Sequence, residues 1–446
     1  MLLDVDLAVD DLGRKMQRKT MVPVIYNLFP TLVGSIDHWP AHAARARDLG
    51  FNWLYVNPFQ SPGFSGSLYA VKDHHRLHPL LEGKTRSPGV EAMAPVIQTI
   101  RGLGLSVMMD LVVNHVAKDS PLISRHPAWF RRDMTGEVGS PSVVDPDDAC
   151  RVTVWGDLAE VDNEGSADRD ALWRFWETLI DRAMDLGFTG FRCDAAYKVP
   201  PELWRRLITR ARGRAPGTLF VAETLGCSPE AVQALEGPGF DYFYNSSKWW
   251  DFVAPWCLEQ HEAFRRIAPS IAFPESHDTP RLAAETGGSE AVQRQRYAFA
   301  AVFSAGVQLT VGYEFGFRRA LDVVKTTPAD WEAPRFDLRD FLRRVNALKT
   351  RHPLLATEGV LRRVETGGDG VTALRRWSDE RGTHRGVILI NSDSGAFREV
   401  EVPAEELPAS ARLYRPCRDD VPDAGFPVPR AVRLAPAEVA LLMEAV

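Results

Sequence analysis

The sequence predicts an α/β protein whose main part is a (β/α)8 TIM barrel, followed by a C-terminal antiparallel β-sandwich domain. Short apolar runs alternate with amphipathic helical stretches from about residue 22 to 350, and several of these runs end in polar residues. From about residue 355, short strand-like runs are separated by Gly, Asp and Pro. Eight strand–helix units are typical of a closed barrel. An open doubly wound sheet is the rival fold, but it requires a Gly-rich turn after its first strand, and residues 26–34 (YNLFPTLVG) contain none.

The barrel elements can be followed in order along the chain. Apolar runs predict strands over residues 23–30, 52–56, 105–115, 190–194, 218–223, 241–245, 271–278 and 307–312. Amphipathic spacing predicts helices between them, among them 39–49, 93–103 and 171–186; Gly50 ends the first and Gly187 the last. The chain therefore divides into an N-terminal leader (1–20), a barrel (21–350) with a loop-rich insert over about 116–165, and a C-terminal β-domain (355–446).

Composition narrows the function classes. A net charge of −6 and a pI of about 6.0 argue against a nucleic-acid partner, which requires concentrated basic charge, and favour a neutral substrate. The longest uncharged stretch, residues 297–313, contains Gln308 and two glycines, and it predicts a core helix and strand, not a membrane span. Five cysteines without CxxC spacing predict reduced thiols, and the acidic N-terminus is unlike a signal peptide, so we expect a cytoplasmic protein. The 12 Trp residues exceed what the core requires, and sugar rings stack on such side chains.

Polar residues at the strand ends indicate the chemistry. The carboxyl ends of barrel strands converge on one region, where the active sites of such folds lie. A single acid after a strand is usually a helix N-cap, but that explanation accounts poorly for acids on four strands together. The residues concerned are Asp110, Asn114 and His115 on the third strand, Arg192 and Asp194 on the fourth, Glu223 on the fifth, and Glu275, His277 and Asp278 on the seventh.

Two of these acids suit the cleavage of a glycosidic bond. A retaining glycosidase requires two carboxyl groups roughly 5–5.5 Å apart, one as nucleophile and one as acid/base. Adjacent barrel strands can supply this spacing through Asp194 and Glu223. Arg192 points to the same side of its strand as Asp194, and its positive charge favours the ionised carboxylate. Glu223 follows the apolar run LFVA, a setting in which a carboxyl group keeps its proton.

Four short segments resemble the signature segments of glycoside hydrolase family 13, the α-amylase family. The resemblance covers residues 24 to about 320, and the C-terminal β-domain is similar to the usual C-terminal module of the family. The four segments are DLVVNH (110–115), GFRCDAAYK (190–198), VAETLG (221–226) and PESHD (274–278). Weaker matches are SLYAVKDH (67–74), WGDLAEVD (155–162) and GYEFG (312–316).

The resemblance implies a role for each matching residue. Asp194 corresponds to the nucleophile, Glu223 to the acid/base, and Asp278 to the third acid, which binds sugar hydroxyls and favours the distorted transition state. The residues implied to bind substrate are Tyr69, Asp73, His115, Arg192 and His277, with Tyr197 and Lys198 in acceptor subsites. Asp110 and Asn114 correspond to structural positions.

One departure from the family pattern concerns calcium. Many α-amylases have Lys and then His at the third and fourth positions after the nucleophile, where they serve an acceptor subsite and a calcium site, but this chain has Tyr197 and Lys198. Asn114 matches a calcium ligand of those enzymes, yet the insert is short. We therefore expect no essential calcium, no other metal and no cofactor. The cluster His74, His75 and His78 is interpreted as ordinary loop histidines.

Three functional hypotheses follow. The leading one is a retaining α-glycosidase or transglycosidase that acts on α-glucans or malto-oligosaccharides. The second is a maltosyltransferase or phosphorylase with a sugar-phosphate, because the segment from Phe191 also resembles the maltosyltransferase branch of the family; that branch usually lacks the pair His277–Asp278, which this chain has. Phosphate would require a cation such as Lys198, Lys248 or Arg281. The third is a non-catalytic relative that binds a sugar or a partner protein, but such relatives lose catalytic acids, and all three are present.

Overall fold

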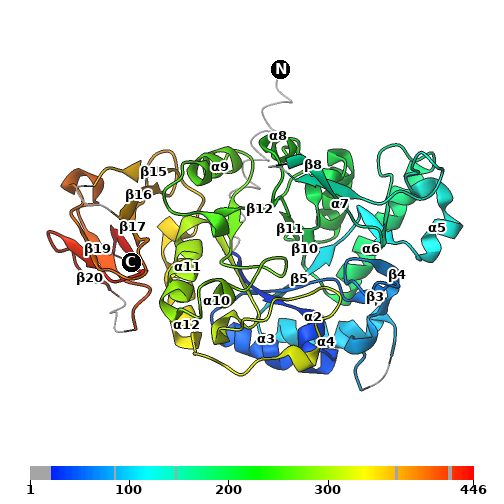
Figure 1. Cartoon of the computed structure of the whole chain (residues 1–446), viewed down its shortest axis with the longest axis horizontal. Coiled ribbons are helices and arrows are strands. Elements are labelled where there is room, and N and C mark those ends of the chain that lie inside the picture. Colours follow the sequence, from blue (N-terminus) through cyan, green and yellow to red (C-terminus); the bar gives the residue numbers. More distant parts are fainter. Residues whose placement is uncertain (1–21, 85–86, 146–147, 367–369, 420–423, 446) are drawn as a thin grey trace.

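The predicted barrel is confirmed. A computed structural model describes residues 22–84, 87–145, 148–366, 370–419 and 424–445, so the predicted leader lies outside the described residues. Eight parallel strands close into a barrel in the order β1-β14-β13-β12-β11-β10-β5-β2 (Figure 1). They are β1 (Val24–Leu28), β2 (Trp53–Val56), β5 (Ser106–Leu111), β10 (Gly190–Cys193), β11 (Leu219–Ala222), β12 (Tyr242–Tyr244), β13 (Ser270–Ala272) and β14 (Gly306–Thr310).

Most barrel strands end within two residues of the prediction, but two end well before it. The third barrel strand ends at Leu111 and the seventh at Ala272, where the sequence predicts strands to 115 and 278. In both places the residues that follow, Asn114 and His115 after the third strand and His277 and Asp278 after the seventh, lie beyond the barrel ladder. The neighbouring β10 and β11 are aligned with Cys193 opposite Ala222. The next residue on each strand, Asp194 and Glu223, therefore stands at the same level.

Helices pack around the barrel where their apolar faces meet it. In α6 (Arg169–Leu186) the buried residues recur every three or four positions, as an amphipathic helix requires. Gly187 ends this helix with a φ of 105°, and a Cβ there would lie 3.0 Å from Ile97 Cγ2, so glycine fits both the backbone and the space. The other helices are α2 (Pro30–Val33), α3 (Trp39–Asp48), α4 (Met93–Gly102), α5 (Pro121–Arg125), α7 (Pro201–Arg214), α8 (Pro229–Gln233), α9 (Trp256–Phe264), α10 (Leu282–Glu285), α11 (Glu290–Phe303) and α12 (Arg339–Arg351).

The segment after the third barrel strand forms small antiparallel pairs. β6 (His115–Ala117) pairs with β9 (Leu158–Glu160), and β7 (Ser142–Asp145) forms a hairpin with β8 (Asp148–Val154). A further pair, β3 (Gln60–Pro62) and β4 (Val71–Leu77), follows the second barrel strand. The pair β6–β9 and the turns that flank the other strands contribute residues to the site.

The C-terminal region is antiparallel β-structure, as predicted. One sheet has the order β15-β16-β17-β22-β19-β20, and β18 pairs with β21. Side chains alternate along the large sheet: Val387 and Leu389 of β17 face a core shared with β18 and β21, whereas Ile388 and Ile390 join the main core that continues into the barrel. The strands are β15 (Leu361–Val364), β16 (Val371–Trp377), β17 (Arg385–Asn391), β18 (Arg398–Val400), β19 (Ala411–Tyr414), β20 (Phe426–Pro427), β21 (Val432–Leu434) and β22 (Val439–Glu444).

Two buried cations bind backbone carbonyl groups near the border of the barrel and this sheet, and the second of them joins the two regions. The Lys349 ammonium donates to three backbone carbonyl oxygens, those of Ala301, Ser304 and Leu355. The Arg376 guanidinium of β16 donates to the carbonyl oxygens of Leu354, Phe303 and Thr357. Buried carbonyl oxygens require hydrogen-bond donors. Each cation supplies donors to carbonyl oxygens from several segments of the chain at once.

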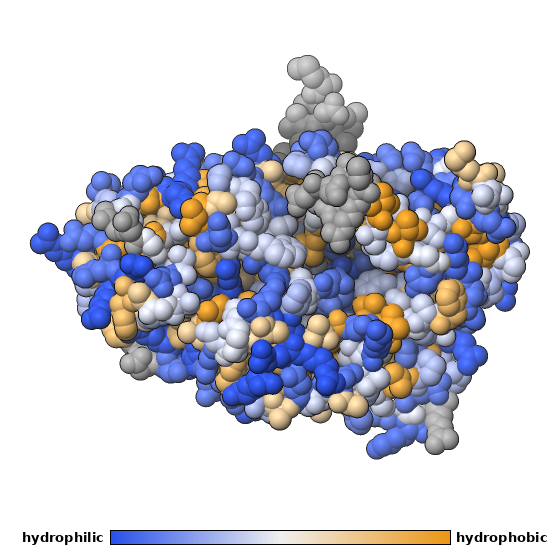
Figure 2. Space-filling model, in the orientation of Figure 1, coloured by the Kyte–Doolittle hydropathy of each residue, from blue (hydrophilic) through white to orange (hydrophobic). Residues whose placement is uncertain are grey.

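The visible surface is mostly hydrophilic, with small hydrophobic patches separated by polar residues (Figure 2). Within the part of the chain that the structure describes, no helix is long and apolar enough to cross a membrane.

Candidate active site

A cavity of about 460 Å³ contains the three acids that the sequence singles out. Its walls come from several barrel-strand ends and from the insert. The predicted residues that line it are Asp194, Glu223, Asp278, Tyr69, Asn114, His115, Arg192, Tyr197 and Lys198. The fold therefore brings together residues that are more than 200 positions apart in the sequence.

Asp194 and Glu223 are joined through the turn between them. Ala195, directly after Asp194, has a left-handed backbone with φ 41° and ψ 48°. This conformation is strained for a residue with a Cβ, and such strain is typical of functional turns. It lets the Ala195 N–H donate to Glu223 Oε2 at 3.0 Å, while the Leu225 N–H donates to Oε1 at 2.8 Å. Both oxygens of Glu223 are thus held by the backbone.

Arg192 orients Asp194 from below. Its Nη1 lies 2.6 Å from Asp194 Oδ1 and 2.9 Å from Asp110 Oδ1, and all three side chains are largely buried. Asp110 also accepts hydrogen bonds of 2.6 Å from Tyr55 and from Tyr69. Asp110 does not line the cavity, so its position agrees with the structural role expected for it.

Burial raises the pKa of Glu223 from 4.5 to about 7, and the nearby charge of Asp194 acts in the same direction against the opposing charge of Arg192. A carboxyl group with this pKa keeps its proton near neutral pH, as a general acid must. The pKa of Asp278 shifts the other way: burial raises it, but the charge and hydrogen bond of His277 outweigh burial and leave it below its usual value.

Two histidines have ring nitrogens without a protein partner. His115 Nε2 and His277 Nδ1 are buried and make no hydrogen bond to any described residue. His277 stacks on Tyr69 with ring centres 5.5 Å apart, and its Nε2 lies 2.7 Å from the Tyr69 hydroxyl oxygen and 2.9 Å from Asp278 Oδ2. Burial lowers the pKa of His115. Unpartnered buried polar atoms beside a cavity require a ligand or water.

Two predicted substrate-binding residues do not line the cavity. His277 lies behind Tyr69 and Asp278 and contacts both. Asp73 lies in β4, where its carboxylate accepts a hydrogen bond of 2.8 Å from the His75 N–H. The expectation for Asp73 came from its spacing to Tyr69, but the chain runs out of the site along β4 after that residue.

The three cations considered for phosphate differ in availability. Arg281 forms an ion pair of 2.7 Å with Glu275, and both side chains are 1% exposed. Lys248 is paired with Glu285 at 3.1 Å. Lys198 lines the cavity, and its ammonium donates a hydrogen bond of 2.7 Å to the Ser142 carbonyl oxygen.

Sequence reasoning missed several residues of the cavity wall. Trp155 and Asp157 come from the turn after β8, and Val323 and Val324 come from the loop after β14. The signal for Trp155 and Asp157 was the weak match of residues 155–162 to a family segment.

The acidic side chains near Asn114, the residue that matches a calcium ligand, lie beside an arginine. Beside it is a polar cavity of about 220 Å³, which Glu160 and Arg131 also line. Arg131 Nε lies 3.6 Å from a carboxylate oxygen of Glu160 and 3.6 Å from one of Asp162, so a side-chain cation already stands between these acids. No group of three or more His, Cys, Asp or Glu side chains among the described residues is arranged to hold a metal ion.

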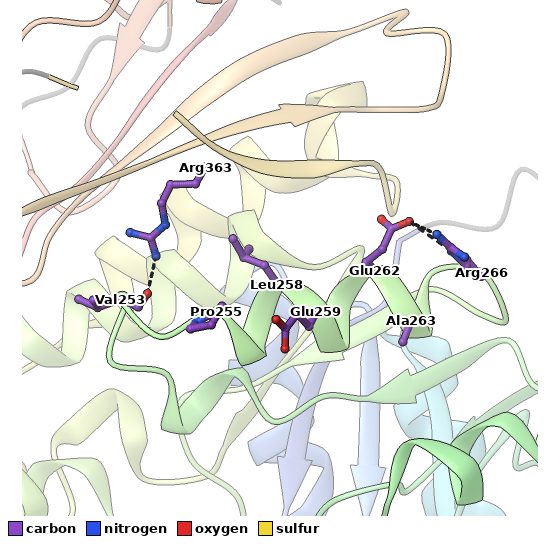
Figure 3. A pocket seen from close by; sticks show the side chains of 8 residues that line it. All are labelled: Val253, Pro255, Leu258, Glu259, Glu262, Ala263, Arg266 and Arg363. Atoms are coloured by element: carbon purple, nitrogen blue, oxygen red, sulfur yellow. Dashed lines mark hydrogen bonds and ion pairs between the residues drawn. The ribbon is translucent and has the colours of Figure 1, made fainter. Parts of the chain in front are cut away.

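A second, larger groove of about 610 Å³ lies between α9 and β15 (Figure 3). Three of its charged side chains are engaged: Glu262 pairs with Arg266 at 2.8 Å, and Arg363 donates a hydrogen bond of 2.8 Å to the Val253 carbonyl oxygen. It contains none of the strand-end acids, so the chemistry belongs to the smaller cavity.

Comparison with known proteins supports this assignment. A family model described as the glucanotransferase domain of glycogen debranching enzyme matches residues 22–130. An α-1,4-glucan:maltose-1-phosphate maltosyltransferase of Burkholderia pseudomallei is 28% identical over 391 residues, which are 84% of this chain and 33% of that protein. The Myxococcus xanthus protein of the same name is 25% identical over 401 residues, covering 81% of this chain and 57% of the relative. The chain thus spans less than two thirds of the length of either relative.

In its signature segments and in its fold, the chain is similar to the α-amylase family, glycoside hydrolase family 13. Solved structures share its fold: an α-amylase from Lactobacillus plantarum has a TM-score of 0.72 at 20% identity, covering 95% of this chain and 99% of that one. A debranching enzyme from Nostoc punctiforme has a TM-score of 0.71 at 18% identity, covering 95% and 98%. In sequence the chain also resembles maltosyltransferases, as the segment from Phe191 indicated.

Proposed function

We propose that this chain cleaves α-glucosidic bonds with retention of configuration and transfers the glycosyl group to water or to a sugar hydroxyl. The observation that carries the proposal is the register of β10 and β11, which sets Asp194 and Glu223 side by side. Adjacent strands lie roughly 4.8 Å apart, close to the roughly 5–5.5 Å between carboxyl groups of retaining enzymes and short of the 6.5–9.5 Å of inverting ones.

In the proposed first step, an oxygen of Asp194 attacks the anomeric carbon. The bond from that carbon to the leaving oxygen breaks, and Glu223 gives its proton to the leaving oxygen. The result is a β-linked glycosyl-enzyme and a free hydroxyl on the leaving group. Glu223, now a carboxylate, then takes a proton from water or a sugar hydroxyl, whose oxygen attacks the anomeric carbon and releases Asp194 with the α-configuration restored.

The other predicted residues serve this chemistry from fixed positions. Asp278 is proposed to bind the hydroxyls of the reacting sugar more tightly as the ring flattens, which lowers the barrier more than it improves binding. The unpartnered nitrogen of His115 is available to the same sugar. Tyr69 is proposed as the aromatic platform under the ring, with its orientation fixed by His277 and Asp110. Tyr197 and Lys198 are proposed to contact the acceptor.

We propose an α-linked glucan or malto-oligosaccharide as substrate, without a cofactor. Two relatives of the chain are maltosyltransferases named for an α-1,4-glucan, which supports this class. Neither a nucleic acid nor a membrane is part of the proposal. A cytoplasmic location stays a proposal; it accords with Cys193, Cys227, Cys257 and Cys417, which are all free thiols.

A donor that carries phosphate is the second candidate. The names of the relatives include maltose 1-phosphate, and Lys198 offers a cation in the cavity. Incubation with maltose 1-phosphate and a glucan acceptor separates the candidates, because release of inorganic phosphate with elongation of the acceptor supports the second and its absence supports the first.

The anomeric form of the first product tests the mechanism. An α-linked maltotetraose or maltose 1-phosphate donor is followed by NMR from the first turnovers, and the α-anomer or an α-linked transfer product is expected. Asp194→Ala should lose nearly all turnover yet still bind oligosaccharide, with Asp73→Ala as the matched control because Asp73 lies outside the cavity. Initial release of the β-anomer would mean inversion, and the nucleophile assignment would have to be abandoned.

A further inference from the structure

One indole in the cavity wall has no part in the proposed chemistry. Trp155 lines the cavity together with the three acids, and it is 39% exposed. A large aromatic side chain is usually buried when its only role is packing. An exposed indole in the wall of a substrate cavity is available to the substrate.

The indole is held in place before any substrate binds. The backbone N–H of Trp155 donates a hydrogen bond of 3.1 Å to the Pro141 carbonyl oxygen, and the Trp155 carbonyl oxygen accepts one of 3.1 Å from the Leu158 N–H. These bonds fix the backbone of the turn after β8. The Lys198 ammonium lies 5.1 Å from the centre of the ring, a cation–π distance. The same ammonium donates to Ser142, at the start of β7. Lys198 therefore ties the hairpin that carries Trp155 to the turn after the nucleophile.

The contact with Lys198 indicates which side of the cleavage point Trp155 serves. Lys198 follows Tyr197, and burial together with the charge of Glu223 raises the pKa of Tyr197. The turn from Asp194 to Lys198 thus runs along Glu223, the group that protonates the leaving oxygen. The reacting sugar is flanked by Tyr69 and Asp278, which His277 connects. Trp155 therefore belongs to the leaving-group side.

We infer that Trp155 is a specificity-determining residue, an aromatic platform for the first sugar unit beyond the cleavage point. This inference rests on the proposed function. The apolar CH groups of a glucosyl ring pack on the exposed indole, and Lys198 positions that indole. Val324, from the loop after β14, is 47% exposed in the same cavity and adds apolar surface for this unit. The platform binds the leaving group in cleavage and the acceptor sugar in transfer.

A donor with a very small leaving group isolates this role. α-Maltosyl fluoride loses fluoride, which fills no sugar subsite, so fluoride release in water reports formation and hydrolysis of the glycosyl-enzyme without the platform. Adding maltose or maltotriose as acceptor then brings the platform into use. The variants are Trp155→Ala and Trp155→Phe, the second to keep an aromatic ring. Trp249→Ala is the matched control: Trp249 is 51% exposed and lies 5.7 Å from Lys248, but it does not line the cavity.

For Trp155→Ala we expect the acceptor concentration at half-maximal transfer to rise about tenfold, equivalent to about 1.4 kcal/mol. Fluoride release without acceptor should stay within about twofold of the wild type, because no sugar ring stacks on Trp155 in that reaction. Trp155→Phe should be intermediate, and Trp249→Ala should behave as the wild type.

Two results would overturn the inference. One is an unchanged acceptor dependence in Trp155→Ala. The other is an equal loss of fluoride release and of transfer in both Trp155→Ala and Trp155→Phe, which would mean that Trp155 only supports the fold. Failure of the proposed function looks different, because the wild type itself would then release no fluoride and form no transfer product.

Discussion

Replacing Glu223 by Gln tests whether the acid/base is tuned by burial. The pKa of Glu223 is raised from 4.5 to about 7, mainly by burial. The difference of about 2.5, at about 1.36 kcal/mol for each pH unit, means that ionised Glu223 destabilises the folded state by about 3 kcal/mol. Gln removes the charge and keeps the size of the side chain.

The sign of the effect follows from the direction of the shift. Because the folded pKa lies above the unfolded one, the stability that Glu223 contributes is fully present below pH 4.5 and is lost as the pH rises through about 7. Gln does not titrate, so the unfolding free energy of Glu223→Gln minus that of the wild type should increase by about 3 kcal/mol over this range. The amide has one acceptor oxygen for the two N–H donors of Ala195 and Leu225, which adds a loss of about 1–3 kcal/mol that does not depend on pH.

Urea unfolding of both proteins between pH 4.5 and 8.5 measures the difference. Asp278→Asn is the control: the pKa of Asp278 is lowered, so its stability contribution is lost only as the pH falls below this range, and its difference curve should be flat. A flat curve for Glu223→Gln as well would refute the argument that burial tunes this carboxyl group. The same tuning predicts that kcat/KM of the wild type falls above about pH 7.

The remaining predictions concern the other acids, the acceptor side, the core and calcium. Asp278→Asn should lower kcat by several orders of magnitude and change KM only modestly, and the reverse pattern would contradict a transition-state role. Lys198→Ala should change the ratio of hydrolysis to transfer products, measured chromatographically; unchanged ratios would remove Lys198 from the acceptor side. Arg281→Met leaves Glu275 buried and unpaired, so the unfolding free energy should fall by about 3–5 kcal/mol, and a stability equal to the wild type would show the pair to be dispensable. A chelator should leave Tm unchanged, because Arg131 stands between Glu160 and Asp162; a large decrease would indicate a structural metal.

The barrel could be predicted because its strands are apolar runs bounded by turn residues and followed by polar ones. The exact strand ends could not. The predicted strands over 105–115 and 271–278 continue past Leu111 and Ala272, where the sheet stops. An extended site segment and a strand share the same local pattern, and only hydrogen bonds to neighbouring strands distinguish them.

The acids of the site could also be anticipated, because each follows an apolar run of the sequence that leads out of the barrel. Residues that reach the cavity through long-range packing could not be identified in this way. Trp155 arrives on a hairpin of the insert, and Val324 arrives on a loop after the last barrel strand. Asp73 illustrates the opposite error, since proximity to Tyr69 in the sequence does not keep it near the cavity once β4 turns away.

The C-terminal sheet, buried on both faces, affects how the chain can be divided and how it unfolds. Cutting before β15 would uncover the apolar side chains that Ile388 and Ile390 cover, and would leave the carbonyl groups held by Arg376 without a donor. A barrel isolated in this way would aggregate, because exposed apolar surface and unpaired backbone groups both favour association. The two regions should therefore melt in one cooperative transition. Removal of the last strand, β22, would then destabilise the barrel and lower activity, although β22 carries no catalytic residue.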